Sequence, residues 1–308
     1  MALNLTSASP AAGPRGKAPS AMPLPGRRSR LAGLAAHAWH NPFFLLAALV
    51  VAAYLLAALF APWVAPYPPT AQDPMHFMAP PNTAHWLGTD SFGQDLLSRT
   101  IHGARYALMI GFFSVLIGAG GGLVVGLAAG LSGGAVEWLL MRLIDAVLAL
   151  PSLIMAIAFI AILGQGVDKV ILAVGVALIG PFARTVRADV LQVKAQAFVE
   201  AAGLMGVRRM AVIWRHILPN VVFPLAVQAT IRISYAILVS SGLSFLGIGV
   251  APPTPDWGLM IAEGRSFVSF APWIAGVPGS ALAILLIALS VVGDGVREQF
   301  DPKLRKQG

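Results

Sequence analysis

Three polar side chains interrupt a long apolar run at helical spacing. Gln228, Arg232 and Tyr235 stand at i, i+4 and i+7, so all three share one face of a helix. An arginine near the middle of a membrane helix costs about 3 kcal/mol on insertion scales and usually faces a cavity or a partner. Two interpretations stay open. The face lines a substrate pathway in which Arg232 meets a carboxylate, or Arg232 makes structural hydrogen bonds to carbonyls or to a neighbouring subunit.

A second group of potential ligands lies in the stretch DPMHFMAPPNTAH. Met75, His76, Met78 and His85 carry the sulfur and imidazole atoms that bind soft and borderline metal ions. The prolines and the irregular spacing argue against a preformed site. We therefore expect no metal site in the chain.

Other catalytic arrangements are missing from the sequence. It contains no recognisable pair of nucleophile and base, and Glu137 and Asp145 lie near Arg142, where salt bridges explain them. The Gly16–Lys17 pair lacks the upstream Gly and the downstream Ser or Thr of a phosphate-binding P-loop. The absence of cysteine excludes disulfides and thiolate metal sites. We expect a protein that is not an enzyme and binds no cofactor of its own.

The composition places these residues in a membrane. The chain of 308 residues is 57% hydrophobic and 11% charged, with a mean hydropathy of +0.77. Its 21 basic and 13 acidic residues are too few to solvate the surface of a soluble domain of this length. The net charge of +8 does not indicate nucleic-acid binding, because apolar segments of bilayer length separate the basic residues.

Six apolar segments are candidates for membrane helices, which need about 20 residues to cross the hydrocarbon core. The sequence therefore predicts an all-α membrane protein. The segments are residues 43–64, 106–130, 146–163, 170–182, 221–246 and 273–292.

The distribution of positive charge orients these segments. Sixteen Lys and Arg residues fall on one side and four on the other, which with Arg232 accounts for all 21. The positive-inside rule then places both termini in the cytoplasm. The four residues on the outer side are Arg99, Arg105, Lys169 and Arg265.

The chain divides into four parts. Residues 1–40, rich in Ala, Pro, Gly, Ser and Arg, are predicted to be a disordered basic cytoplasmic tail. Residues 41–105 hold the first span and an outer segment, residues 106–294 hold five further spans, and residues 295–308 form a cytoplasmic tail.

Glycine recurs every fourth residue in the second span. Gly118, Gly122, Gly126 and Gly130 form one bare ridge along a helix, and repeated GxxxG allows a second helix to approach closely. We favour packing within the subunit over a contact between subunits.

The stretch EAAGLMGVRRMAVIWRHILPN, residues 200–220, is basic and amphipathic instead of apolar. Met210, Ile213, Trp214 and Ile217 share one helical face, and Gly206 permits a turn before them. The pattern predicts two short helices under the membrane, the second stopped by Pro219 before the fifth span. Binding to anionic lipid explains the Trp and Arg residues but not Glu200 and the alanines beside it.

The residues of this stretch resemble the EAA loop of permease subunits of ATP-binding-cassette importers. The matching residues are Glu200, Ala201, Ala202, Gly203, Gly206, Leu218 and Pro219. In that family the loop, here within residues 184–219, docks into a cleft of a cytoplasmic ATPase. The stretches LGTDSFGQDLLSRTIHGARYAL, APPTPDWGLMI and GDGVREQFDPKLR are similar to the second permease of dipeptide and oligopeptide importers.

The resemblance implies the type I importer permease fold and an inner-membrane location. It implies as partners a homologous permease, two ATPases that bind ATP and Mg, and a periplasmic or lipid-anchored binding protein. The implied substrate is a dipeptide or oligopeptide. The alternatives are a nickel chelate or glutathione in the same class of importer, or an autonomous secondary transporter, for which the sequence offers neither internal repeats nor coupling carboxylates.

Overall fold

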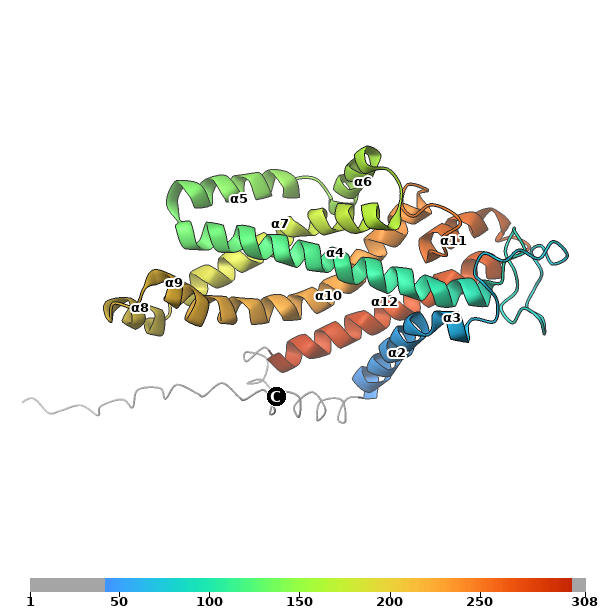
Figure 1. Cartoon of the computed structure of the whole chain (residues 1–308), viewed down its shortest axis with the longest axis horizontal. Coiled ribbons are helices and arrows are strands. Elements are labelled where there is room, and N and C mark those ends of the chain that lie inside the picture. Colours follow the sequence, from blue (N-terminus) through green and yellow to red (C-terminus); the bar gives the residue numbers. More distant parts are fainter. Residues whose placement is uncertain (1–41, 301–308) are drawn as a thin grey trace, which may run out of the picture.

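The computed structural model describes residues 42–300, which form an elongated bundle of helices (Figure 1). The predicted tail at 1–40 and the end of the predicted tail at 295–308 lie outside the described residues. No strand occurs within 42–300, and the prediction of an all-α chain is confirmed there.

Within the described part of the chain, five helices are long and apolar enough to cross a membrane. They match five of the six predicted segments, and each has about the 20 residues or more that crossing requires. They are α2 (Pro42–Leu59), α4 (Leu96–Ser132), α7 (Val167–Lys194), α10 (Leu218–Phe245) with the turns that precede it, and α12 (Trp273–Phe300).

The remaining segment, predicted as one helix over 146–163, is broken. Helix α5 (Gly134–Leu148) ends before Pro151, α6 (Ser152–Leu163) begins after it, and the two axes meet at 88°. The prediction of a single helix was wrong because proline lacks an N–H and disfavours the helical conformation of the residue before it. With 12 residues, α6 is only about 18 Å long. A sixth span exists only if the bent pair is counted as one.

Helix α7 extends well beyond the predicted segment 170–182. It begins after Gly166, accommodates Pro181 within the helix, and continues to Lys194. The first part of the predicted loop 184–219 is therefore helical and belongs to α7. Thr185, Asp189 and Gln192 fall on one face of this extension.

Helices α4 and α7 share the most extensive helix contact in the described chain. A Cβ atom built on Gly118, Gly122, Gly126 or Gly130 would lie 2.3–2.7 Å from the Cβ of a residue on α7. The α7 residues, in the same order, are Leu178, Phe182, Val186 and Val190. One α7 side chain therefore packs against each of these glycines. The glycine ridge is thus a contact within the chain, as predicted.

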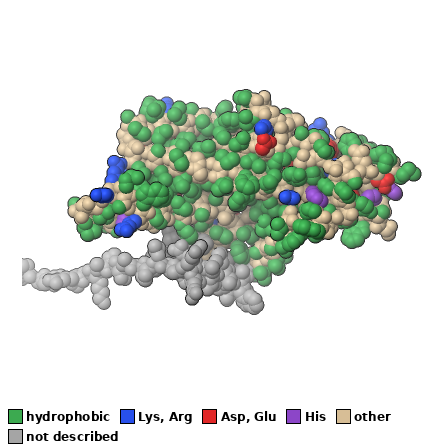
Figure 2. Space-filling view, in the orientation of Figure 1, with side chains coloured by type: hydrophobic (Ala, Val, Ile, Leu, Met, Phe, Trp, Pro, Cys, Tyr) green, Lys and Arg blue, Asp and Glu red, His purple; other side chains and the backbone are tan. Residues whose placement is uncertain are grey.

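The two ends of the bundle differ. One end carries the loop before α4, the short helix α3 (Ala61–Val64), helix α11 (Trp257–Gly264) and the 3-10 turn η2 (Arg265–Phe267). The other end carries α8 (Ala197–Leu204), α9 (Arg209–Val212) and the π-helical turn η1 (Ile213–Ile217). Figure 2 shows a largely hydrophobic face between them, with Lys and Arg gathered at the α8–α9 end. This pattern fits a bundle surrounded by lipid.

We expect Gly122→Ala to destabilise the chain, because the new methyl group meets Phe182 Cβ at 2.3 Å. Overpacking of this kind costs about 1–3 kcal/mol. Gly120→Ala is the matched control, since no atom lies within 4 Å of its added Cβ. Thermal unfolding of the purified variants in detergent measures the difference, and equal midpoints for the two variants would contradict the proposed tight contact.

Candidate functional site

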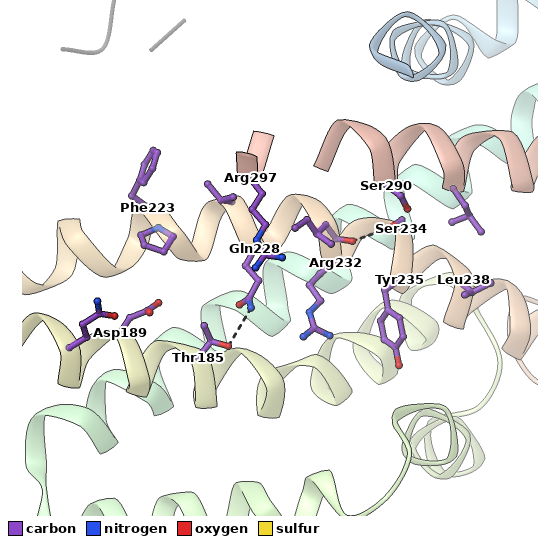
Figure 3. A pocket seen from close by; sticks show the side chains of 15 residues that line it. Thr185, Asp189, Phe223, Gln228, Arg232, Ser234, Tyr235, Leu238, Ser290 and Arg297 are labelled. Atoms are coloured by element: carbon purple, nitrogen blue, oxygen red, sulfur yellow. Dashed lines mark hydrogen bonds between the residues drawn. The ribbon is translucent and has the colours of Figure 1, made fainter. Parts of the chain in front are cut away.

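A cavity of about 890 Å³ lies between α7, α10 and α12 (Figure 3). Gln228, Arg232 and Tyr235 all line it, as their shared helical face requires. The other residues that line it with polar side chains are Thr185, Asp189, Gln192, Ser234, Ser290 and Arg297. The structure thus gathers the three polar residues predicted from the sequence around one hollow.

Arg232 is one of three charged residues that line this cavity, together with Asp189 and Arg297. Its guanidinium carbon lies 6.0 Å from the centroid of the Tyr235 ring, within the range of a cation–π contact. The Tyr235 hydroxyl forms a hydrogen bond with Ser152 at the start of α6. No carboxylate of residues 42–300 forms an ion pair with Arg232. Its side chain therefore remains available to a ligand.

Two acceptor atoms in the cavity wall lack hydrogen-bond partners among residues 42–300. They are Oδ2 of Asp189 and Oε1 of Gln228, both buried. The amide nitrogen of Gln228 donates to Thr185 Oγ1 at 3.4 Å. Buried polar atoms without partners are costly, so each requires water or a ligand. The residues that line the cavity therefore include two acceptors without partners and the cation of Arg232.

The sequence analysis missed Thr185, Asp189 and Arg297. They were assigned to loops beyond the predicted ends of the fourth and sixth spans, which the structure extends as helix. Thr185 and Asp189 stand four residues apart, a spacing that would have placed them on one helical face had α7 been predicted at its full length.

Helix α8 carries the EAA residues at the far end of the bundle. Gly206 ends it with φ +73°, and the N–H groups of Gly206 and Val207 donate to the carbonyls of Gly203 and Ala202. This is a Schellman ending, which favours glycine at the left-handed position. The predicted turn at Gly206 is confirmed.

Exposure divides the EAA residues into two groups. Glu200, Ala201 and Gly203 lie on the surface, whereas Ala202 is 3% exposed and packs into the core of the chain. The small side chain of Ala202 therefore allows α8 to pack closely against the bundle. Leu204 and Met205, 84% and 75% exposed, extend the surface of α8 with large apolar side chains that this chain leaves uncovered.

Pro219 does not stop the helix that precedes the fifth span. Helix α9, η1 and α10 follow one another without a break, and Pro219 is the second residue of α10. The prediction of a separate second helix was wrong, because proline is tolerated in the first turn and the π-helical turn accommodates its missing N–H. Leu218 and Pro219 are thus part of a continuous helical segment, Arg209–Phe245.

A buried network of ion pairs stabilises the end of the bundle that carries α11. Arg99 on α4 is 2% exposed and pairs with Asp90 in the preceding loop and, at 3.4 Å, with Glu263 on α11. Burial raises the pKa of Glu263, and the charge of Arg99 opposes that shift. The indole of Trp257 donates to the Thr100 carbonyl at 3.0 Å. Apart from Glu263, these residues belong to the stretches LGTDSFGQDLLSRTIHGARYAL and APPTPDWGLMI, whose role here is structural.

The predicted ligands of the outer loop separate in the structure. Met75 is exposed and Met78 packs against the core, while His76 and His85 approach each other with Asp73 between them. Asp73 was not among the residues considered from the sequence.

The chain is similar in sequence to known proteins over most of its length. Residues 122–306 match the family described as binding-protein-dependent transport system inner membrane component, and residues 38–81 match the N-terminal TM domain of oligopeptide transport permease C. The di/tripeptide transport system permease protein DppC of Pseudomonas aeruginosa is 42% identical over 86% of this chain and 90% of its own. The glutathione transport system permease protein GsiD of Escherichia coli is 41% identical over 85% and 86%.

A solved structure has the same fold. The MetNI methionine ABC transporter, in inward-facing conformations, superposes with a TM-score of 0.55 at 20% identity, over 66% of this chain and 97% of that one. This likeness supports the importer permease fold predicted from the sequence.

We expect Arg99→Met to destabilise the chain strongly, because it leaves Asp90 buried without its ion-pair partner. Removing one partner of a buried pair costs about 3–5 kcal/mol. Arg105→Met, which removes an exposed arginine of the same helix, is the control. Thermal unfolding in detergent compares them, and equal loss in both variants would show that the network does not fasten the outer end.

Proposed function

The chain belongs to the family of binding-protein-dependent transport system inner membrane components, and we propose that it passes peptides through the cavity between α7, α10 and α12. It is a multi-pass protein of the inner membrane and a permease subunit of an importer complex. The observation that carries the proposal is the cavity itself, in which Arg232 and Asp189 face the same space without partners of opposite charge.

The charges of the cavity suit a peptide. A peptide carries a terminal carboxylate, which Arg232 would bind, and a terminal ammonium, which Asp189 and Gln228 Oε1 would accept. The volume of about 890 Å³ falls within the range of about 300–1,000 Å³ that is usual for small-molecule sites. Apolar residues such as Phe223 and Leu238 supply a wall that does not select among side chains.

The α8 surface would couple this cavity to an ATPase. Glu200 and Ala201 are exposed beside the uncovered Leu204 and Met205, a combination that suits a protein partner better than water. The continuous segment Arg209–Phe245 joins this end to Gln228, Arg232 and Tyr235. A displacement of the α8 end would therefore move the cavity wall directly.

The complete importer would contain four further subunits of three kinds. A second permease would close the cavity, which this chain leaves open to the surface, and a binding protein would deliver substrate at the α11 end. Two ATPase subunits would bind ATP and Mg and occupy the cytoplasmic side together with both chain termini. Energy then comes from the partners, and this chain supplies the pathway.

Glutathione is a second candidate substrate. The GsiD relatives are glutathione permeases and are nearly as similar to this chain as the DppC relative. Glutathione is itself a small peptide with carboxylates and an ammonium, so the same cavity groups would bind it. Uptake of a labelled dipeptide in competition with glutathione distinguishes the two substrates.

We expect Glu200→Lys to abolish substrate-stimulated ATPase activity and transport while the chain still folds. Glu200 is exposed and forms no ion pair within residues 42–300, so the reversal of charge affects a partner and not the fold. The importer purified in mild detergent gives both the ATPase rate and the identity of the chains that co-purify.

Arg215→Glu is the control for this change, because it reverses an exposed charge on η1 outside α8. We expect Arg215→Glu to lose substantially less substrate-stimulated ATPase activity and transport than Glu200→Lys. If Glu200→Lys retained its ATPase subunits, its stimulation and its transport, the α8 surface would not be the coupling site.

We expect Arg232→Gln to lower peptide uptake at least about tenfold, since a hydrogen bond to a charged group is worth about 1.5–3 kcal/mol and each 1.4 kcal/mol is tenfold. The complex should assemble and hydrolyse ATP without substrate as before. Arg105→Gln, outside the cavity, is the control. Unchanged uptake by reconstituted Arg232→Gln importer would leave Arg232 with a structural role only.

A further inference from the structure

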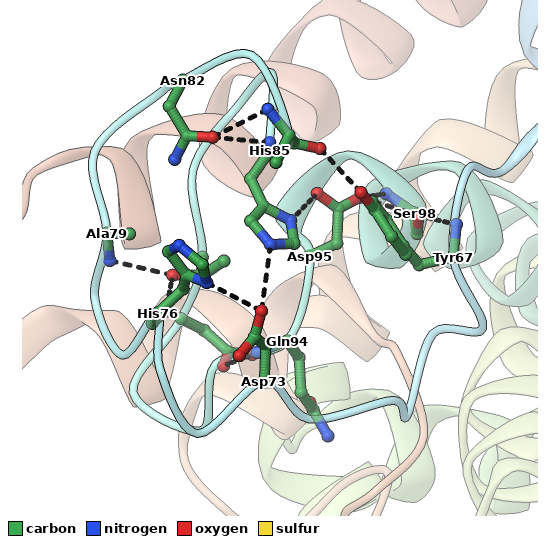
Figure 4. A network of polar contacts seen from close by, with 12 residues as sticks. Tyr67, Asp73, His76, Ala79, Asn82, His85, Gln94, Asp95 and Ser98 are labelled. Atoms are coloured by element: carbon green, nitrogen blue, oxygen red, sulfur yellow. Dashed lines mark hydrogen bonds and ion pairs between the residues drawn. The ribbon is translucent and has the colours of Figure 1, made fainter.

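The loop before α4 brings three metal-binding side chains together (Figure 4). Asp73, His76 and His85 each present one ligand atom, and these atoms all lie within 4.8 Å of one another. His76 Nδ1 is 2.7 Å from Asp73 Oδ2, and His85 Nε2 is 3.9 Å from the same oxygen. One carboxylate oxygen therefore faces two imidazole nitrogens.

The orientation of His85 is fixed by a buried carboxylate. His85 Nδ1 is 3.0 Å from Asp95 Oδ1, and the other oxygen of Asp95 accepts from the Ser98 N–H and hydroxyl at 2.8 and 2.7 Å. In the neutral imidazole the proton therefore resides on Nδ1, which donates to Asp95. The Nε2 lone pair then points towards Asp73 and His76. A carboxylate that holds the remote nitrogen of a histidine is the usual support of a metal ligand.

The backbone around the group is fixed as well. Asp73 N donates to the Gly93 carbonyl at 3.1 Å, and its Oδ1 accepts from the Met75 N–H at 2.9 Å. Asn82 Oδ1 accepts the His85 N–H at 2.9 Å.

We propose that Asp73, His76 and His85 bind one divalent transition-metal ion of the Zn²⁺ type. Two imidazoles and one carboxylate are ligands typical of Zn²⁺, which takes four ligands and would complete its shell with water. The exposed side of His76 leaves room for that water. The site departs from the sequence-based expectation, because the prolines of this loop lie between the ligands and the hydrogen bonds above hold the ligands together.

The ion would join the loop to α4. Asp73 and His76 stand in the middle of the loop, whereas His85 is connected through Asp95 to the first turn of α4. A bound metal ion adds a link between these parts and stabilises the chain by a free energy that grows with the logarithm of its concentration above Kd. This site does not depend on the proposed transport function, since it lies at the α11 end, away from the cavity.

Zinc binding by the purified full-length chain tests the proposal. The protein, carrying a tag without histidine, is stripped with a chelator, dialysed, and titrated with Zn²⁺ by calorimetry, with Co²⁺ absorption as a readout of coordination geometry. We expect one ion per chain. His76→Gln and Asp73→Asn should each weaken binding at least about tenfold, the scale of losses at metal sites. His76 is exposed, so its replacement leaves the fold intact.

His102→Gln is the matched control, because His102 lies on α4 outside the group and contacts the Ser98 carbonyl. It should bind Zn²⁺ as the unmodified chain does. Zn²⁺ should also raise the thermal unfolding midpoint of the unmodified chain and of His102→Gln, but not of His76→Gln. Absence of saturable binding, or equal affinity in His76→Gln, Asp73→Asn and the unmodified chain, overturns the proposal.

Discussion

Helices α4 and α7 approach closely because α4 presents glycine at every fourth position and α7 fills each gap with a larger side chain. In lipid, where apolar burial gives little drive for association, such contact is a principal source of helix pairing. The pair fixes two distant regions at once. At its start, α4 has Asp95 as the N-cap residue and carries Arg99, which forms the buried ion pairs. Towards its end, α7 carries Thr185 and Asp189, which line the cavity. The remaining helices are arranged around this axis.

Helix α10 connects the cavity to the α8 end without a flexible joint. The π-helical turn η1 lies just before Pro219, where the α-helical hydrogen-bond pattern loses one donor. Turns of this kind occur inside α-helices and are frequent at functional sites. A bundle with a rigid α4–α7 pair and one continuous helix reaching the α8 surface is suited to transmit a displacement from that surface. Under the proposed function, that displacement would reach the cavity wall that carries Arg232.

The sequence predicted the parts of the fold that rest on composition and periodicity. Hydropathy found five spanning helices, and helical spacing placed Gln228, Arg232 and Tyr235 on one face. It failed at prolines, because a proline either breaks a helix or is accommodated within one. Pro151 breaks a helix, whereas Pro181 and Pro219 lie within continuous helical segments. The hydropathy of α7 falls before its helix ends, so Asp189 was assigned to a loop.

The proposed metal-binding group of Asp73, His76 and His85 could not be predicted from the sequence for a related reason. Asp73 and His85 stand twelve positions apart in a stretch without periodicity, and they meet only because the loop folds back on the first turn of α4. The sequence motifs that carry the family resemblance specify the fold and not the transported substrate. The residues that carry the resemblance, including Asp90, Arg99 and Trp257, are buried and hold the outer end together. Under the proposed function, substrate binding depends on cavity residues such as Asp189 and Arg232, which lie outside that buried network.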